Sequence, residues 1–142
     1  MRFKRAIATG ATAAAVGVGM LATAGPAHAS ASKCNGGSVF TACVSVKGSG
    51  LTVREVTAFG DCSRYPGCTP NPRAVVATKF RLEIKEPGRP LYKKTSPVRN
   101  YKSKQVGIKI TPNRNYRDNT KVCVTSWRNT DKVGTACVTV RR

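Results

Sequence analysis

Residues 74–85 read AVVATKFRLEIK, and this stretch indicates the fold class more clearly than any other part of the chain. Its apolar residues Phe80, Leu82 and Ile84 alternate with charged residues at every odd position from 79 to 85. Side chains that repeat every two residues share one face of a β-strand, so the stretch predicts a strand with one buried face and one solvent-facing side. The turn-forming residues PGRP at 87–90 end this strand.

On either side of this stretch, the same alternation recurs in short segments, and no window keeps helical periodicity over the length of a helix. In residues 51–59 the apolar positions change parity, which predicts a β-bulge near Arg54 and Glu55. The stretch at 62–72 is rich in Gly, Pro and Asn and predicts a loop. The other predicted strands cover residues 38–46, 51–59, 91–95, 105–110, 121–127 and 133–140.

Short strands separated by turns over the whole length predict an all-β fold. We expect a small, disulfide-stapled antiparallel β-sandwich with immunoglobulin-like topology. A small closed β-barrel is the alternative, because it uses the same pattern of short alternating strands.

The first 29 residues have the pattern of an export signal. Basic residues lie within the first five positions, an uncharged stretch covers residues 6–24, and Ala27-His28-Ala29 supplies the small residues that precede a cleavage site. We therefore expect a signal peptide at 1–29, a single β-sandwich domain at 30–142, and a secreted, extracellular protein. An uncleaved membrane anchor is the alternative reading of the uncharged stretch.

The charge and the histidine content exclude most enzyme chemistry. The chain carries 25 Lys and Arg against 6 Asp and Glu, a formal charge of +19. Removing residues 1–29 leaves 22 basic and 6 acidic residues, or +16, and removes His28, the only histidine. Without histidine the domain has no Ser-His-Asp or Cys-His pair, and its carboxylates are scattered. We expect no enzyme, no cofactor and no metal; serines beside lysines, such as Ser103, are expected by chance in so basic a chain.

Cysteines are even in number, which in a short exported chain predicts a disulfide framework. Cys62 and Cys68 bracket a turn-rich loop, and Cys123 and Cys137 flank a polar turn at 129–131 across which they would face each other. The remaining two would form the third bond. A zinc site is the alternative, although paired C-x2–4-C motifs are missing. The six cysteines are Cys34, Cys43, Cys62, Cys68, Cys123 and Cys137.

One long basic segment is the best candidate for a binding site. No acidic residue occurs from Pro87 to Arg117, and tyrosines are interspersed among the basic residues. Such a segment can bind an acidic protein or the anionic polymers of a cell envelope, while export makes nucleic acid unlikely. The alternative is a charged surface that only keeps the protein soluble. The candidate binding residues are Arg89, Lys93, Lys94, Arg99, Tyr101, Lys102, Lys104, Arg114 and Arg117.

Two segments bear on how the sheets end. Lys93 and Lys94 lie on a predicted edge strand, where lysines discourage strand pairing. A free strand edge can also accept a strand from a partner. Residues 30–37 are polar, and we expect them to fray, with docking into a partner's cleft as the alternative.

The layout resembles a group of small exported bacterial proteins. The shared features are a leader ending in Ala27-His28-Ala29, a stapled β-domain of this length, and Cys123 and Cys137 on the closing hairpin. Within that group it is most similar in format to the small adaptor subunit of umbrella toxin particles. This resemblance implies a non-enzymatic, antibacterial role in which the chain links a lectin-bearing subunit to a large repeat-bearing toxin.

Two other functions fit the same format. Small exported protease inhibitors display a rigid loop, for which the segment from Cys62 to Cys68, with Arg64, is a candidate. A basic antimicrobial protein would instead bind anionic cell envelopes directly.

Overall fold

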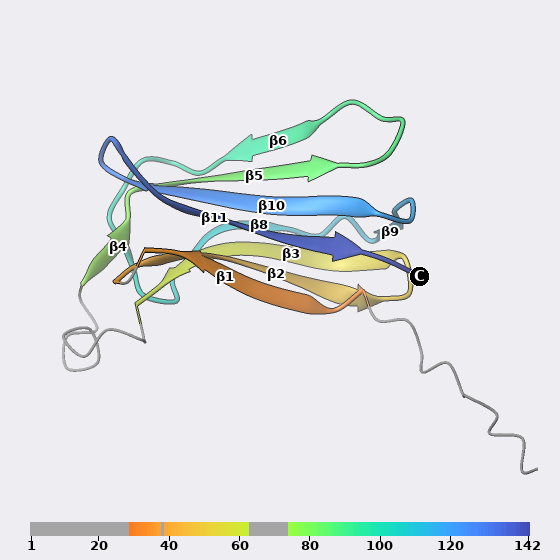
Figure 1. Cartoon of the computed structure of the whole chain (residues 1–142), viewed down its shortest axis with the longest axis horizontal. Helices are drawn as coiled ribbons and strands as arrows, with labels where there is room; N and C mark the ends of the chain where they lie inside the picture. The colour runs from red at the N-terminus through yellow and green to blue at the C-terminus, as the bar shows by residue number, and fades with distance from the viewer. Residues whose placement is uncertain (1–28, 38, 63–73) are drawn as a thin grey trace, which may run out of the picture.

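The computed structural model describes residues 29–37, 39–62 and 74–142. In this part of the chain every regular element is a β-strand, and the strands form two large antiparallel sheets that pack face to face, together with a small two-stranded sheet (Figure 1). The predicted all-β sandwich is therefore confirmed. The sheets do not join into a closed ring, so the barrel alternative is wrong. None of the described residues forms a helix long and apolar enough to span a bilayer.

The first sheet has the strand order β1-β2-β3-β8, and the short strand β9 also pairs with β3. All of its pairs are antiparallel. Its strands are β1 (Ala31–Gly36), β2 (Thr41–Ser49), β3 (Thr52–Asp61), β8 (Val106–Ile110) and β9 (Arg114–Asn115).

The second sheet has the order β11-β10-β5-β6, and the small ribbon β4-β7 lies beside it. This order matches the G-F-C-C′ sheet of an immunoglobulin-like sandwich, while β2, β3 and β8 occupy the A, B and E positions. The strands are β4 (Val75–Ala77), β5 (Lys79–Lys85), β6 (Tyr92–Thr95), β7 (Tyr101–Lys102), β10 (Thr120–Arg128) and β11 (Asp131–Val140).

Alternation in β5 builds the core as the sequence predicts. Phe80, Leu82 and Ile84 are all buried between the sheets. The ring of Phe80 meets Tyr101 edge-on, with centroids 5.0 Å apart. Gly107 on β8 leaves the space that this ring fills, because an added Cβ would lie 2.6 Å from a ring carbon. The inner faces of β5 and β8 are therefore fitted to each other at this glycine.

Each predicted strand is present, but the bounds shift by up to three residues, most in the strand predicted at 38–46, which is observed as Thr41–Ser49. The short strands β7 and β9 were not predicted. The stretch 74–85 is divided at Thr78 into β4 and β5. The predicted bulge is present, because Lys47 faces Glu55 while Gly48 faces Val53, which leaves Arg54 as the extra residue. Lys93 and Lys94 lie on β6, the edge strand that residues 91–95 predicted.

The expectation that residues 30–37 fray is wrong. Residues 31–36 form β1, which pairs with β2 along its whole length. Its side chains are mostly exposed, so it lacks the alternation by which a buried strand is recognised. Backbone pairing and the bond between Cys34 and Cys43 hold it instead.

Disulfides connect directly opposed residues of neighbouring strands. Cys34 bonds to Cys43 between β1 and β2, and Cys123 bonds to Cys137 between β10 and β11, as predicted. These four cysteines are cross-linked and so do not serve as zinc ligands. Cys62 is also disulfide-bonded, and its predicted partner Cys68 lies outside the described residues. Disulfides persist in oxidising compartments, so these bonds fit an extracellular environment.

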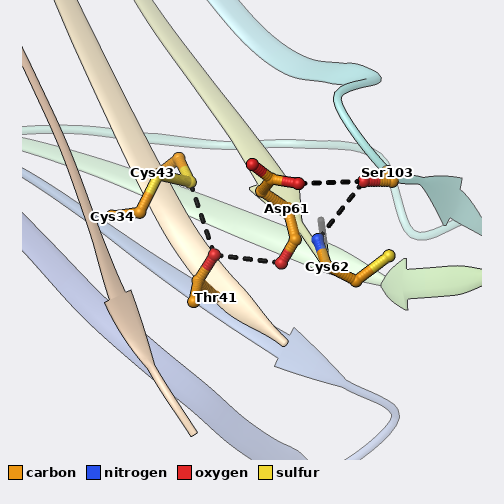
Figure 2. Close-up of a disulfide and its surroundings, with 6 residues drawn as sticks. All are labelled: Cys34, Thr41, Cys43, Asp61, Cys62 and Ser103. Atoms are coloured by element: carbon orange, nitrogen blue, oxygen red, sulfur yellow. Dashed lines mark hydrogen bonds between the residues drawn. A yellow bond between two sulfur atoms is a disulfide. The ribbon is translucent and has the colours of Figure 1, made fainter. Parts of the chain in front are cut away.

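Ser103 anchors the end of β3, close to the first disulfide (Figure 2). Its hydroxyl donates to Asp61 at 3.2 Å and accepts the backbone N–H of Cys62 at 3.2 Å. On the other side, the hydroxyl of Thr41 donates to the carbonyl of Asp61 at 3.0 Å. Ser103 is thus part of a structural junction at the end of β3.

Candidate binding site at the open edge of the sandwich

The two long sides of the sandwich end differently. On one side β1 lies against β11, and the amide of Asn35 donates to the carbonyl of Thr135 at 2.9 Å. The backbones are so close that a Cβ on Gly134 would lie 2.6 Å from the Cα of Gly36. We call this the sealed edge, because β1 and β11 pack directly on each other along it. A hollow of about 300 Å³ lies at its end, lined by residues of the β1–β2 turn and of the β10–β11 hairpin, among them Phe40 and Arg128.

On the opposite side the sheets end at β6 and β8, and each of these strands has one paired neighbour in the described part of the chain. Figure 1 shows β6 as the outer strand of its sheet. We call this side the open edge. A groove of about 350 Å³ lies there between the sheets. It is lined by Tyr92, Ile110, Thr111, Pro112, Arg114 and Tyr116.

Aromatic and apolar side chains line part of the groove, so it can hold a nonpolar group. Leu91 and Tyr92 are among the exposed large hydrophobic residues, at 45% and 46% exposure. Tyr116 is buried and its ring carries the guanidinium of Arg114, whose central carbon lies 3.9 Å from the ring centroid. The groove therefore combines an apolar wall with a cationic one.

Glu86 organises the cationic wall. Its carboxylate is only 5% exposed and accepts a hydrogen bond from the Arg114 guanidinium at 3.0 Å and from the backbone N–H of Arg117 at 3.1 Å. The guanidinium of Arg89 lies 3.6 Å away. The side chain of Arg117 donates instead to the carbonyl of Pro87 at 2.9 Å. One carboxylate thus gathers three arginines, and two positive charges remain in excess.

The same contacts set the pKa values. Burial acts to raise the pKa of Glu86, but the hydrogen bonds from Arg114 and from the N–H of Arg117 outweigh it and hold the pKa below its usual value. For Arg114, burial acts to lower the pKa, but the hydrogen bond to Glu86, the charge of Glu86 and the interactions with Tyr116 together outweigh it and raise the pKa. Both groups are therefore charged at neutral pH, and the cluster is a fixed source of positive potential.

Lys93 and Lys94 extend this positive charge along β6. Lys94 pairs with Leu82 and Tyr92 pairs with Ile84, so these side chains share the inner face of the sheet. Lys93 pairs with Glu83 on the outer face, where their charged atoms are 3.8 Å apart. The open edge therefore carries lysines on both faces of the strand.

The rest of the predicted basic segment lies elsewhere. Tyr101 is fully buried, and its hydroxyl donates to the carbonyl of Pro97 at 2.8 Å, so it belongs to the core rather than to a contact surface. The guanidinium of Arg99 packs over its ring, and Lys102 is exposed on β7. Lys104 lies on the outer face of the first sheet. The segment thus divides into separate regions, of which the open edge holds five of the nine predicted residues: Arg89, Lys93, Lys94, Arg114 and Arg117.

A shallow hollow on the outer face of the first sheet was not foreseen from the sequence. It has a volume of about 580 Å³, and Phe59 and Val106 lie in it beside charged side chains. There Glu55 bonds to Lys109 at 2.8 Å and to Lys47 at 3.0 Å, and these lysines lower its pKa. Three lysines and two carboxylates line this hollow, so its charges largely cancel, whereas the arginine cluster beside the groove keeps two positive charges in excess. In β3 and β8 the side chains that alternate with the buried ones face outward together, and this alternation in the sequence could have indicated the hollow.

The groove also escaped the sequence analysis, since it depends on which strands end the two sheets. No three His, Cys, Asp or Glu side chains come together as a metal site within 29–37, 39–62 and 74–142.

Comparison of the chain with protein-family models, with curated proteins and with solved structures found no match.

Proposed function

We propose that this chain is an exported, non-enzymatic protein that binds another protein at its open edge. The observation that carries the proposal is the groove between β6 and β8, where an apolar wall meets a fixed cluster of arginines. Aromatic residues and arginine are the residue types that contribute most to protein interfaces. The positive potential selects an acidic partner and speeds its encounter.

We further propose that this binding is that of an adaptor in an antibacterial toxin complex, linking a lectin-type subunit to a large repeat-bearing toxin. The support is the format of the chain: a leader-like start, a single small β-sandwich and cross-strand disulfides. An adaptor needs two contact surfaces. The open edge and the hollow around Phe59 are two separate surfaces on different sides of the first sheet.

The experiment is recovery of the tagged full-length chain from the culture medium of the organism that encodes it. At physiological salt we expect it to elute as a complex with one or more secreted proteins, and light scattering gives the mass. Because the interface is charged, the complex should dissociate as salt is raised well above about 0.15 M, where the Debye length is about 8 Å. A partner-free monomer at physiological salt would contradict the proposal.

The two other functions that fit the format give different results. An inhibitor would block trypsin-like or subtilisin-like proteases at micromolar concentration; the loop with Arg64 that would do so lies outside the described residues. A direct antimicrobial would kill bacteria as the pure chain, and added salt would weaken the killing. Activity of the pure chain in either assay would replace the adaptor proposal.

A further inference from the structure

We propose that the partner contributes an extended, acidic segment that adds to β6 as a further antiparallel or parallel strand, with one apolar side chain in the groove. This inference rests on the proposed function and specifies how the partner is bound. It follows from the backbone of β6, from the parity of its side chains and from the charge around it.

The backbone of β6 has free groups on the open side. The N–H of Ser96 donates to the carbonyl of Phe80 at 2.9 Å, so Ser96 directs its backbone toward β5. In an antiparallel pair, alternate residues point their N–H and C=O groups toward the partner strand and away from it. Thr95 and Lys93 lie one and three residues before Ser96, so both have the opposite parity and direct these groups outward. A strand added here could form hydrogen bonds with the outward N–H and C=O groups of these two residues.

The side chains of β6 determine what the added strand carries. Tyr92 and Lys94 are on the inner face of the strand, where Tyr92 lines the groove, while Lys93 faces outward. Residues of an added strand stand opposite these and share their faces. An apolar residue opposite Tyr92 would enter the groove against Ile110 and Pro112. A carboxylate two residues along would stand opposite Lys94, and a carboxylate between them opposite Lys93.

Charge excludes a second copy of this chain and favours an acidic segment. If β6 paired with β6 of another copy, lysines would face lysines, which is unfavourable. The groove itself adds Arg114, whose counter-ion Glu86 is shared with Arg89. On the opposite, sealed edge β1 packs on β11 and Asn35 bonds to Thr135. The hollow of about 300 Å³ on that side lies at the β10–β11 turn, where Phe40, Arg128 and Asp131 are among its lining residues. A strand added to β6 therefore lies beside a groove that can take an apolar side chain, and the charge around it selects an acidic segment.

The test uses the synthetic peptide Glu-Val-Glu-Glu-Val-Glu-Glu-Val as the probe, because a register that puts Val opposite Tyr92 then puts Glu opposite both Lys93 and Lys94. Amide hydrogen exchange of the full mature domain is measured by NMR. We expect the peptide to protect the amides of Lys93 and Thr95. Thr95→Pro removes one outward N–H without touching a bond to β5, and prolines are tolerated on edge strands; it should abolish this protection. Lys94→Glu should weaken binding about five- to tenfold, through loss of one charge pair and creation of a repulsive one.

The matched control is Lys121→Glu, which makes the same charge change at an exposed position of β10, away from the open edge. Its affinity for the peptide should stay within about twofold of the parent. Thermal melting of each variant shows that it is folded.

Several results would overturn the inference. These are binding weaker than about 1 mM, equal binding by the Thr95→Pro variant, or protection over the hollow around Phe59 in place of β6. The inference requires a segment that is acidic, extended and contains an apolar residue. Binding of a Val-Lys peptide or of poly-glutamate with the same affinity as the probe would therefore also overturn it. So would tight binding of a peptide with the sequence of residues 90–97, which would identify a second copy as the occupant.

The same variants separate this inference from the proposed function. If Thr95→Pro and Lys94→Glu still recover the secreted partner from culture medium, the chain is an adaptor that binds in another way. If the unmodified chain recovers no partner, the proposed function itself fails.

Discussion

The side-chain amide of Asn35 donates to the carbonyl of Thr135 at 2.9 Å, across the two sheets of the sandwich. This bond joins β1 to β11, two strands that are 100 residues apart in sequence at these positions. It closes one long side of the molecule, while the side formed by β6 and β8 stays open. The asymmetry locates the candidate binding site at the open edge.

Gly134→Ala should destabilise the sealed edge. An added Cβ would press on the backbone of Asn35 and Gly36, which cannot move as a flexible side chain does. We expect a loss of about 1–3 kcal/mol in the free energy of unfolding, measured with urea. The control is Gly37→Ala, where a Cβ meets nothing within 4 Å and stability should be nearly unchanged. Equal effects of the two substitutions would show that the close approach of β1 and β11 does not constrain the fold.

Replacing both Cys34 and Cys43 by Ser should free β1. The bond closes a short loop, with a sequence separation of 9, and chain entropy predicts a loss of about 2.5–3 kcal/mol. Because the side chains of β1 are mostly exposed, little packing would replace the bond. Amide exchange should therefore accelerate in β1 far more than in β5. Uniform acceleration across both sheets would contradict this local role. Intact protein should show no free thiol.

The sequence predicts those strands in which apolar residues repeat at every second position, because this repeat follows directly from the burial of one face. The strand at 79–85 is evident because burial of Phe80, Leu82 and Ile84 imposes a period of two. β1 has no such repeat, and its pairing is decided by a disulfide and by a neighbouring sheet. The position of the groove depends on strand order, which periodicity does not encode. Periodicity likewise does not show that Tyr101, which the sequence places within the basic segment, is buried in the core.

Tyr101→Phe tests that reassignment. The substitution keeps the ring that packs on Phe80 and removes only the hydrogen bond to the carbonyl of Pro97. We expect a loss of about 1 kcal/mol in stability and no change in partner affinity, measured by titration calorimetry. A change in affinity at unchanged stability would instead place Tyr101 at the interface.

Tyr92→Ala is the complementary variant, because Tyr92 lines the groove and is half-exposed; it should weaken binding and leave stability nearly unchanged.

Glu86→Gln should remove part of the stability of the open edge and part of its dependence on pH. The pKa of Glu86 is lowered in the folded protein, because the bonds from Arg114 and Arg117 outweigh the effect of burial. A carboxylate with a lowered pKa stabilises the fold above its unfolded pKa of about 4.3, and this contribution is lost as pH falls through the lower, folded value. We therefore expect the parent to lose stability progressively below about pH 5.

In the Gln variant this loss should be smaller, and stability at pH 7 should be about 1–3 kcal/mol lower, because charged hydrogen bonds to Arg114 and Arg117 are replaced by neutral ones. Glu55→Gln is the matched control, since Glu55 bonds to two exposed lysines and its pKa is also lowered. Solvent screens that exposed site, so its effect at neutral pH should be the smaller of the two. Urea unfolding at a series of pH values measures both variants. If Glu55→Gln cost more than Glu86→Gln, the arginine cluster would not be the charge centre that holds the groove together.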